Sequence, residues 1–241
     1  MKRFYKETAT EAGEGGYRIL LDGRPMRTPA KSILVVPTAP LAEAIAEEWS
    51  GVPEKAEINA AHLPLTRLAA TGLDRVVSRR EEVIADTAKY AGSDLLCYRA
   101  STPDSLVKLQ HETWQPLLDW AAERYGARFT VAEGITFVDQ PEDAKTRLKE
   151  AVVSYSDAAL SALYNLTHTS GSVVIALAVA EGRLTTEGAF AAAQVEELYQ
   201  IERWGDDPHA RKQREGVQKD IEACARFLEL LGNKKLKGRD T

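Results

Sequence analysis

The residues whose spacing could support catalysis lie in the segment THTSGSVV, where His168 is close in sequence to Ser170 and Ser172. A serine near the start of a helix can act as a nucleophile when a histidine accepts its proton. Proximity in sequence does not establish such a pair, and the GxSxG motif of a nucleophile elbow is absent. The same hydroxyls are typical helix N-caps, because they accept hydrogen bonds from unpaired backbone N–H groups. The sequence favours capping, and a small-molecule hydrolase or transferase that uses His168 and Ser170 is the alternative hypothesis.

Motifs for nucleotide, metal or disulfide chemistry are absent from the sequence or incomplete. The segment GEGGYR is rich in glycine, but we expect a strand after it, whereas a phosphate loop needs the N-terminus of a helix there. No GxxxxGK(S/T) motif occurs, so the sequence shows no phosphate loop for ATP hydrolysis. The four histidines show neither HxH nor HExxH spacing, and Cys97 and Cys224 form no CxxC pair. We therefore expect no metal and no cofactor, and two buried thiols.

The composition favours a soluble globular protein without nucleic-acid or membrane partners. The 241 residues are 44% hydrophobic and 28% charged, and the formal net charge is −5. An acidic chain binds poorly to polyanions such as nucleic acid or an anionic membrane surface. The longest apolar run, VVIALAVA from Val173 to Ala180, is shorter than the roughly 20 residues of a membrane span, so we expect a buried helix. The segment MKRFYKETAT lacks the apolar centre of a signal peptide, and the lysine-rich NKKLKGR near the end suits a solvated tail.

The first part of the chain, from Arg3 to about Thr38, has the pattern of β-strands. Asp22 and Gly23 separate two extended runs in YRILLDGRPMRTP, and this dipeptide is a strong signal for a hairpin. The segment SILVVP follows and is rich in β-branched residues. Prolines in this part cannot donate to a ladder, which predicts strands with open or bulged edges.

From Pro40 onward, apolar residues recur with helical spacing. The segment PLAEAIAEEWSG places Leu41, Ile45 and Trp49 on one stripe, and Gly51 suits the C-terminal cap. This change of period marks the beginning of a helical region.

Several further helices are predicted from capping residues. We expect Thr66 to cap one long helix that runs through RLAATGLDRVVSRREEVIADTAKY. Ser105 should open another, which Pro116 kinks and Gly126 ends, and Pro141 suits the first turn of the next. The stretch RFTVAEGITFV is ambiguous between strand and loop.

The last third of the chain reads as a helical pair and one long final helix. The pair spans residues 156–167 and 172–181, with THTSGS between them, and Asp207 followed by proline should start a helix that ends near Gly232. The fold class is therefore α+β, with a small β-rich part packed against a larger helical part. We predict two domains, a β-rich N-terminal domain at residues 1–65 and a helical C-terminal domain at residues 66–241.

The segment VEELYQIERWGDD, which begins at Val195, departs from the pattern of a helix that only packs. On a helical wheel the apolar side holds Val195, Leu198 and Tyr199, with Glu202 in its middle. Trp204 falls on the opposite, polar side. A buried unpaired carboxylate is costly, and an exposed indole is a typical interface anchor. Two interpretations stay open: a helix that frays so that Trp204 folds into the core, and a protein-binding surface.

Four separated blocks of the sequence resemble one protein family. The blocks are GGYRILLDGRPMRTPAKSILVVPTAPLAEAIAEEW, INAAHLPLTRLAATGLDRV, DLLCYRA and VEELYQIERWGDD. In this order and spacing, they are similar to the assembly chaperone that attends the alpha subunit of the F-type ATP synthase catalytic sector. The resemblance extends from about Arg3 to Asp207 and implies a β-rich part followed by a helical part, with no enzymatic activity.

The resemblance also implies which residues bind the partner. Acidic residues before the YQ dipeptide are implicated in the function of the family, and here they are Glu196 and Glu197. The tryptophan of the EEW block is also important in the family. Together with the wheel of the VEELYQIERW segment, this predicts the partner-binding residues Glu196, Glu197, Tyr199, Gln200, Trp204 and Trp49.

The implied function has a simple physical basis. An unassembled alpha subunit exposes apolar and charged surface that drives aggregation, so a chaperone must cover this surface. Because the sequence shows no nucleotide motif, we expect ATP-independent release by exchange with the beta subunit. The sequence does not show the long N-terminal targeting extension of mitochondrial members, so we expect a bacterial, cytoplasmic and monomeric protein.

Overall fold

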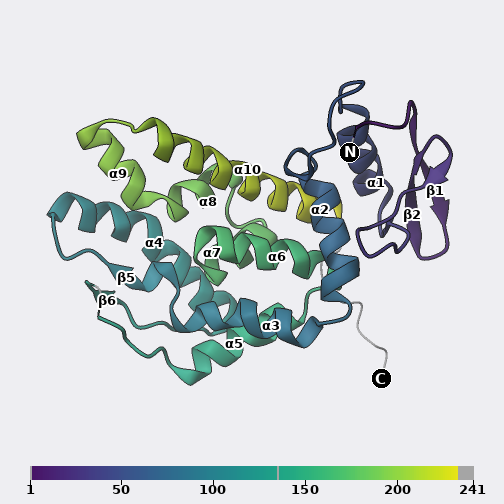
Figure 1. The fold of residues 1–241 in the computed structure, drawn as a ribbon. Helices are drawn as coiled ribbons and strands as arrows, with labels where there is room; N and C mark the ends of the chain where they lie inside the picture. Colours follow the sequence, from purple (N-terminus) through teal and green to yellow (C-terminus); the bar gives the residue numbers. More distant parts are fainter. Residues whose placement is uncertain (1, 135, 233–241) are drawn as a thin grey trace, which may run out of the picture. The chain divides into compact units, whose positions relative to one another are not determined.

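The computed structural model describes residues 2–134 and 136–232 of the chain. A four-stranded sheet forms before the first long helix, and helices dominate the remainder, with one short two-stranded sheet among them (Figure 1). The predicted α+β fold class, a small β-rich N-terminal part and a larger helical part, is confirmed. The predicted lysine-rich tail lies outside the described residues.

The chain forms two compact units, and each unit combines segments that are separated in the sequence. The first unit comprises Met1–Arg80, Tyr155–Ala162 and the described residues from Arg226, and the second comprises Glu81–Ser154 and Leu163–Ala225. The predicted domain division after residue 65 stays a prediction.

The sheet of the first unit is built from hairpins. At Asp22 and Gly23 both φ angles are positive, 48° and 75°, as the central residues of a type I′ hairpin turn require. The predicted hairpin at this dipeptide is confirmed, and β2 pairs antiparallel with three neighbours. The strands are β1 (Thr8–Gly13), β2 (Gly16–Leu21), β3 (Arg24–Pro25) and β4 (Val35–Val36).

The glycine-rich segment GEGGYR contains the turn between β1 and β2 and the first residues of β2. Gly16 has a φ of 143°, and a Cβ at this position would lie 2.3 Å from the carbonyl oxygen of Val36. Only glycine fits this close approach of two backbones. As predicted, a strand and not a helix follows the turn, so the segment has no helix N-terminus that could hold a phosphate.

Helix α1 (Ala39–Ser50) covers the sheet with the predicted apolar stripe. Thr38 is its N-cap and accepts a hydrogen bond from the backbone of Leu41, and Gly51 donates to the carbonyl of Glu47 at the other end. The predicted stripe and the predicted cap at Gly51 are therefore confirmed.

The predicted single helix capped by Thr66 is wrong. Instead, α2 (Pro64–Thr71) starts three residues earlier, with Leu63 and not Thr66 at its N-cap position. A π-type turn follows at Gly72–Val76, and α3 (Arg80–Ala88) comes after it. The cap comes from α1, because the Glu48 carboxylate accepts the backbone N–H groups of Leu65 and Thr66 at 2.7 and 2.9 Å. A capping group 17 residues away cannot be found from local spacing.

Helices of the second unit follow the predicted pattern with small shifts. The Gly126 cap is left-handed, with a φ of 74°, and every residue of the VVIALAVA helix is buried, as predicted. In the ambiguous stretch, the short strand β6 (Ala132–Glu133) pairs in parallel with β5 (Tyr98–Arg99). The helices are α4 (Asp104–Tyr125), α5 (Glu142–Val153), α6 (Asp157–Ser170), α7 (Val173–Ala180), α8 (Thr186–Ala193), α9 (Val195–Trp204) and α10 (Pro208–Leu230).

The loop predicted from THTSGS is mostly helix. Helix α6 continues to Ser170, and it ends at Gly171, whose φ of 71° is left-handed. The predicted start of the final helix is confirmed, because the Asp207 side chain accepts the backbone N–H of Ala210 at 2.8 Å. None of the described helices has both the length and the apolar content that a membrane crossing needs.

The buried carboxylate of Asp94 accepts a backbone N–H group in the first turn of α7, in the second unit. It accepts the backbone N–H of Val174 at 3.2 Å and that of Leu96 at 3.1 Å, and it is fully buried. Burial raises the pKa of Asp94 to about 6, although the hydrogen bonds from Ser172 and the backbone act to lower it. Cys97 and Cys224 are both buried and neither forms a disulfide, which confirms the predicted buried thiols.

Candidate functional site

Helix α9 buries one face and exposes a mixed acidic and apolar surface. Val195 and Tyr199 are buried, at 4% and 5% exposure, whereas Trp204 is 75% exposed. The interpretation in which Trp204 folds into the core is therefore wrong. Glu202 is also exposed, so the carboxylate expected in the apolar arc meets solvent. The helix packs through a narrower face than the wheel suggested, because Leu198 is exposed as well.

The Glu196 carboxylate is held in place by a side chain of α4. The Gln110 side chain is fully buried and donates to the Glu196 carboxylate at 2.8 Å. The other end of the same amide accepts the backbone N–H of Ala100 at 2.7 Å. Gln110 is therefore fixed at both ends, and it presents Glu196 in a defined position at the first turn of α9.

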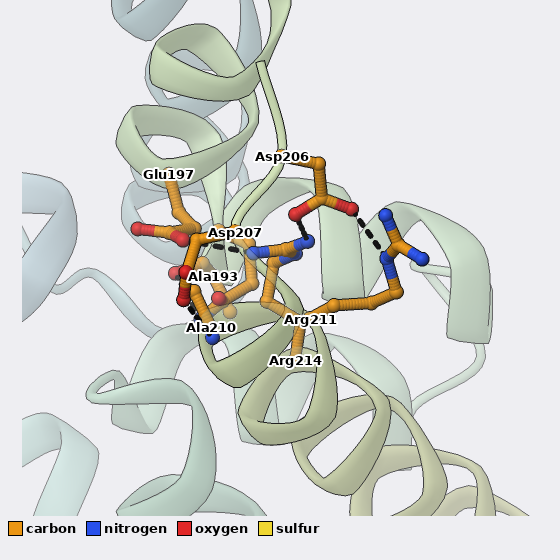
Figure 2. A network of polar contacts seen from close by, with 8 residues as sticks. Ala193, Glu197, Asp206, Asp207, Ala210, Arg211 and Arg214 are labelled. Atoms are coloured by element: carbon orange, nitrogen blue, oxygen red, sulfur yellow. Dashed lines mark hydrogen bonds and ion pairs between the residues drawn. The ribbon is translucent and has the colours of Figure 1, made fainter. Parts of the chain in front are cut away.

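The Glu197 carboxylate is held by α10. Figure 2 shows the Arg214 guanidinium between two carboxylates, that of Glu197 on α9 and that of Asp206 in the connecting turn. Its bond to Glu197 measures 2.9 Å, and Arg211 donates to the other oxygen of Asp206 at 2.7 Å. Arg214 is buried, at 8% exposure, whereas the Glu197 side chain stays 39% exposed. The Glu197 Oε1 atom is thus paired with Arg214, and part of the side chain remains exposed to solvent.

These ion pairs shift the pKa values of the groups that make them. Hydrogen bonds from Arg211 and then Arg214 hold the pKa of Asp206 below its ordinary value. Burial acts to lower the pKa of Arg214, but its bonds with Asp206 and Glu197 raise it above its ordinary value. Both groups therefore stay charged, and the turn between α9 and α10 is fixed by charge-assisted hydrogen bonds.

Tyr199 anchors α9 to the beginning of α4. Its hydroxyl lies 2.7 Å from the Ser105 hydroxyl, and Arg203 donates to the same Ser105 oxygen at 2.8 Å. The Arg203 guanidinium also lies over the Tyr199 ring, 4.4 Å from its centroid. Tyr199 is thus a packing residue under the surface, whereas Gln200 is exposed and lines a hollow of about 280 Å³ with Glu196 and Glu197.

Apolar side chains are also exposed on α9 and α4, the helices that carry Glu196, Glu197 and Gln110. Trp204 ends α9, and Leu198 on α9 and Leu109 on α4 are each 36% exposed. We name Glu196, Glu197, Leu198, Gln200 and Trp204 together the α9 surface. It combines two oriented negative charges with a large aromatic side chain, which is typical of a protein-binding surface and not of a catalytic cleft.

Trp49 belongs to the first unit, so the structure does not bring it together with the α9 surface within one compact unit. Its indole N–H donates to the Thr66 hydroxyl at 2.9 Å, and its carbonyl accepts the Tyr5 hydroxyl at 2.6 Å. Trp49 is 9% exposed and links α1 to α2.

The arrangement that a catalytic serine would need is not formed. The Ser170 hydroxyl is buried and lies 2.7 Å from the carbonyl oxygen of Leu166, four residues earlier in α6. Ser172 is the N-cap of α7 and accepts the backbone N–H of Ile175 at 3.0 Å. His168 instead places its Nδ1 atom 3.0 Å from the Tyr90 hydroxyl. The capping interpretation is confirmed for Ser172, and Ser170 bonds to the backbone.

Within residues 2–134 and 136–232, no three His, Cys, Asp or Glu side chains are grouped as metal ligands would be.

Sequence reasoning missed Gln110 and Arg214, the two side chains that hold the acidic pair. Arg214 could have been found, because it lies three residues before Val217 on the same apolar stripe of α10, which also holds Ile221. A charged residue at a buried position of a stripe predicts an ion pair. Gln110 gives no comparable signal, because its partners are brought close only by the fold.

Comparison with known proteins finds the same fold and sequence pattern elsewhere. The family model described as ATP12 chaperone protein matches residues 2–122. The mitochondrial protein atp12 of Schizosaccharomyces pombe is 28% identical over 221 residues, which cover 86% of this chain and 76% of that protein.

Solved structures agree over nearly the whole chain. The crystal structure of Atp12 from Paracoccus denitrificans has a TM-score of 0.89 at 38% identity and covers 95% of this chain and 98% of that one. A protein from Agrobacterium tumefaciens has a TM-score of 0.90 at 41% identity, with 95% of this chain and 86% of that chain covered.

Proposed function

Because this chain belongs to the ATP12 chaperone family of ATP synthase assembly chaperones, we propose that it binds the unassembled alpha subunit of the F-type ATP synthase. It prevents aggregation of that subunit without ATP hydrolysis and hands it over to the beta subunit. Family membership supports the general role, and the resemblance of the sequence blocks suggests the alpha subunit as client.

The observation that supports the binding site best is the exposure of Trp204, which follows Gln200 by about one helical turn and Glu197 by about two on α9. An indole that is 75% exposed at the end of a helix is poorly placed for stability, because its apolar surface stays in water. The same side chain suits an interface, since tryptophan buries a large area at little cost in conformational entropy. The α9 surface is therefore the proposed contact with the alpha subunit.

The two carboxylates of this surface would give specificity for a client with basic groups. Glu196 and Glu197 are each held by a buried partner, so little side-chain freedom is left to lose on binding. Oriented carboxylates favour basic groups on the client and disfavour acidic ones, which gives specificity more than affinity.

Release follows from competition and needs no enzymatic step. The beta subunit buries the same surface of the alpha subunit in the assembled enzyme, so it displaces the chaperone by mass action. Affinity for the client must then be moderate, because a very slow dissociation rate would block assembly. On this proposal the protein is a monomer in the bacterial cytoplasm, it has no catalytic activity, and Trp49 contributes to client binding.

A charge reversal at Glu197 tests the proposed contact. Glu197→Lys replaces attraction to a basic client group by repulsion, and we expect the affinity for purified alpha subunit to fall about tenfold or more. Isothermal titration calorimetry measures the affinity, and circular dichroism on heating measures stability. The matched control is Glu123→Lys, an exposed residue of α4 with the same change of charge, which should bind like the wild type.

The pairing of Glu197 with Arg214 requires a second variant, because Glu197→Lys also removes an internal ion pair. Glu197→Gln keeps a side-chain oxygen that can accept from Arg214, leaves the Arg214–Asp206 pair in place and removes the surface charge. The proposal predicts that this variant keeps thermal stability close to that of the wild type and still binds weakly. Retention of both stability and binding would make Glu197 a purely structural residue.

A further inference from the structure

The first unit contains a hollow with an apolar lining and a basic rim. It has a volume of about 550 Å³. Its apolar lining is buried at Met26, Leu34, Trp49 and Leu63 and meets solvent in part at Pro29, Ile58, Ala60 and Ala70. A hollow of this size is in the range of pockets that bind ligands and can accept a large apolar side chain.

The rim carries an excess of positive charge. Arg27, Arg67 and Arg75 line the hollow and are exposed, and Asp74 is the acidic residue among the lining residues. The Asp74 carboxylate already accepts hydrogen bonds from the Thr28 hydroxyl at 2.7 Å and from a backbone N–H at 3.0 Å. By formal charge, the lining residues hold three guanidinium groups and one carboxylate, and a second carboxylate, that of Glu48, accepts a hydrogen bond from Thr66 of the lining. The formal sum is positive, opposite in sign to the −5 of the whole chain.

A second hollow extends this surface. It has a volume of about 540 Å³ and shares Met26, Arg27 and Trp49 with the first. Arg24 lines it, together with Phe4, which is 61% exposed. Its acidic residue is Asp22, whose carboxylate accepts the backbone N–H groups of Lys6 and Glu7, each at 2.9 Å. Apolar walls and arginines thus continue from one hollow to the next.

We infer that these adjoining hollows form a second client-binding site, which takes an extended segment with a large apolar side chain flanked by carboxylates. The apolar side chain enters the hollow lined by Trp49 and Leu63, and the carboxylates meet the arginines of the rim. Charge complementarity selects the occupant, because arginine forms bidentate bonds with carboxylates and its rim position leaves the apolar lining accessible. This inference rests on the proposed function in one respect, that the segment belongs to the alpha subunit.

The apolar lining separates this ligand from other anions. Inorganic phosphate or a nucleotide phosphate would use the arginines and leave the apolar walls in water. Nucleic acid would be repelled by the net acidic chain around the site. An acidic and apolar peptide uses both features at once.

The experiment uses two labelled synthetic peptides on the full-length protein. One has the pattern Glu-Leu-Glu-Phe-Glu and the other Lys-Leu-Lys-Phe-Lys, and fluorescence anisotropy measures binding. The test variant is Arg67→Glu with Arg75→Glu. The matched control is Arg128→Glu with Lys149→Glu, which makes the same change of charge at exposed positions of the second unit. Thermal melting checks each fold, and Arg67→Gln with Arg75→Gln replaces the test variant if the reversed one fails to fold.

The wild type and the control should prefer the acidic peptide, and the test variant should lose about tenfold or more in affinity for it. The reversed variant should gain preference for the lysine peptide. Equal binding of the acidic peptide by the test variant and the control would overturn the inference. Displacement of this peptide by an equal concentration of phosphate would also overturn it, because it would identify a small-anion site.

Intact alpha subunit separates failure of this inference from failure of the proposed function. If the wild type and the test variant bind alpha subunit equally, the second client site is refuted and the proposed function stands. If the wild type fails to bind alpha subunit and still binds the acidic peptide through the arginines, the proposed function fails and the peptide site stands.

Discussion

The carboxylates of Glu196 and Glu197 are positioned by buried side chains of neighbouring helices. Gln110 and Arg214 are both buried, and each bonds to one of these carboxylates. A surface that is ordered before binding loses less conformational entropy when a partner arrives. At the scale of single residues, the protein thus resembles a rigid half of an interface.

Asp94 gives a residue-scale prediction about pH. Its pKa is about 6 in the folded state and near 3.8 in an unfolded chain, so the folded state binds more protons between these values. The contribution of Asp94 to the free energy of unfolding is therefore largest below about pH 4 and decreases by ~3 kcal/mol as the pH rises to about 7. In Asp94→Asn this change should be missing.

Urea unfolding of both proteins at several pH values between about 4 and about 7 measures this difference. Asp94→Asn also loses an acceptor for one of the backbone N–H groups, which adds a constant offset at all pH values. A wild-type-minus-variant difference that does not change with pH would show that Asp94 does not titrate in this window.

At this scale, the sequence predicted the helix caps better than it predicted which side chains are buried. Asp207 and Ser172 were recognised as caps, because a cap acts on residues close in sequence. Glu202 was expected within an apolar arc and is exposed, because α9 buries only the side that holds Val195 and Tyr199. A wheel gives angles around a helix, whereas burial depends on which neighbouring helix lies there.

At the scale of elements, α9 ends in Trp204, a side chain that we expect to contribute little to the stability of the folded protein. Trp204→Ala should change the free energy of unfolding by less than about 0.5 kcal/mol, because the side chain is 75% exposed. The same change should weaken binding of the alpha subunit about tenfold or more, as expected for an aromatic anchor. Calorimetric titration and urea unfolding measure the two effects.

A matched control for this variant is Phe137→Ala, which removes another exposed aromatic side chain of the second unit, 67% exposed. It should bind like the wild type. If both variants lose affinity to the same degree, general loss of exposed apolar surface explains the effect, and the assignment to α9 is wrong.

Elements were predictable where local signals determine them. The hairpin at Asp22 and the buried α7 follow from turn chemistry and an apolar run. The start of α2 was not predictable, since Glu48 caps it from another helix, and the break after α2 falls at Gly72, where the backbone of Ala158 comes close. Contacts between distant residues decided each error.

At the scale of the whole molecule, the two proposed client contacts belong to different compact units. The α9 surface lies in the second unit, and the hollows around Trp49 lie in the first. One accepts basic groups and the other acidic groups, so together they would select a client by both charges. Two moderate contacts on one client raise the overall affinity, and each can still be displaced separately.

The sequence alone showed no chemistry that identifies this function, since a binding surface needs no motif. Separated blocks in a fixed order led to the family, and the family model and solved structures confirm it. The arginine-rimmed hollow was not predicted, because Arg27, Arg67 and Arg75 come from segments that only the fold brings together.

Light scattering of purified alpha subunit, with and without this protein and with no nucleotide present, tests the central claim most directly. We expect an equimolar amount of the protein to suppress aggregation, and addition of the beta subunit to release the free chaperone, as size-exclusion chromatography would show. Unchanged aggregation of the alpha subunit, or release that requires ATP, would contradict an ATP-independent chaperone that acts by covering and exchange.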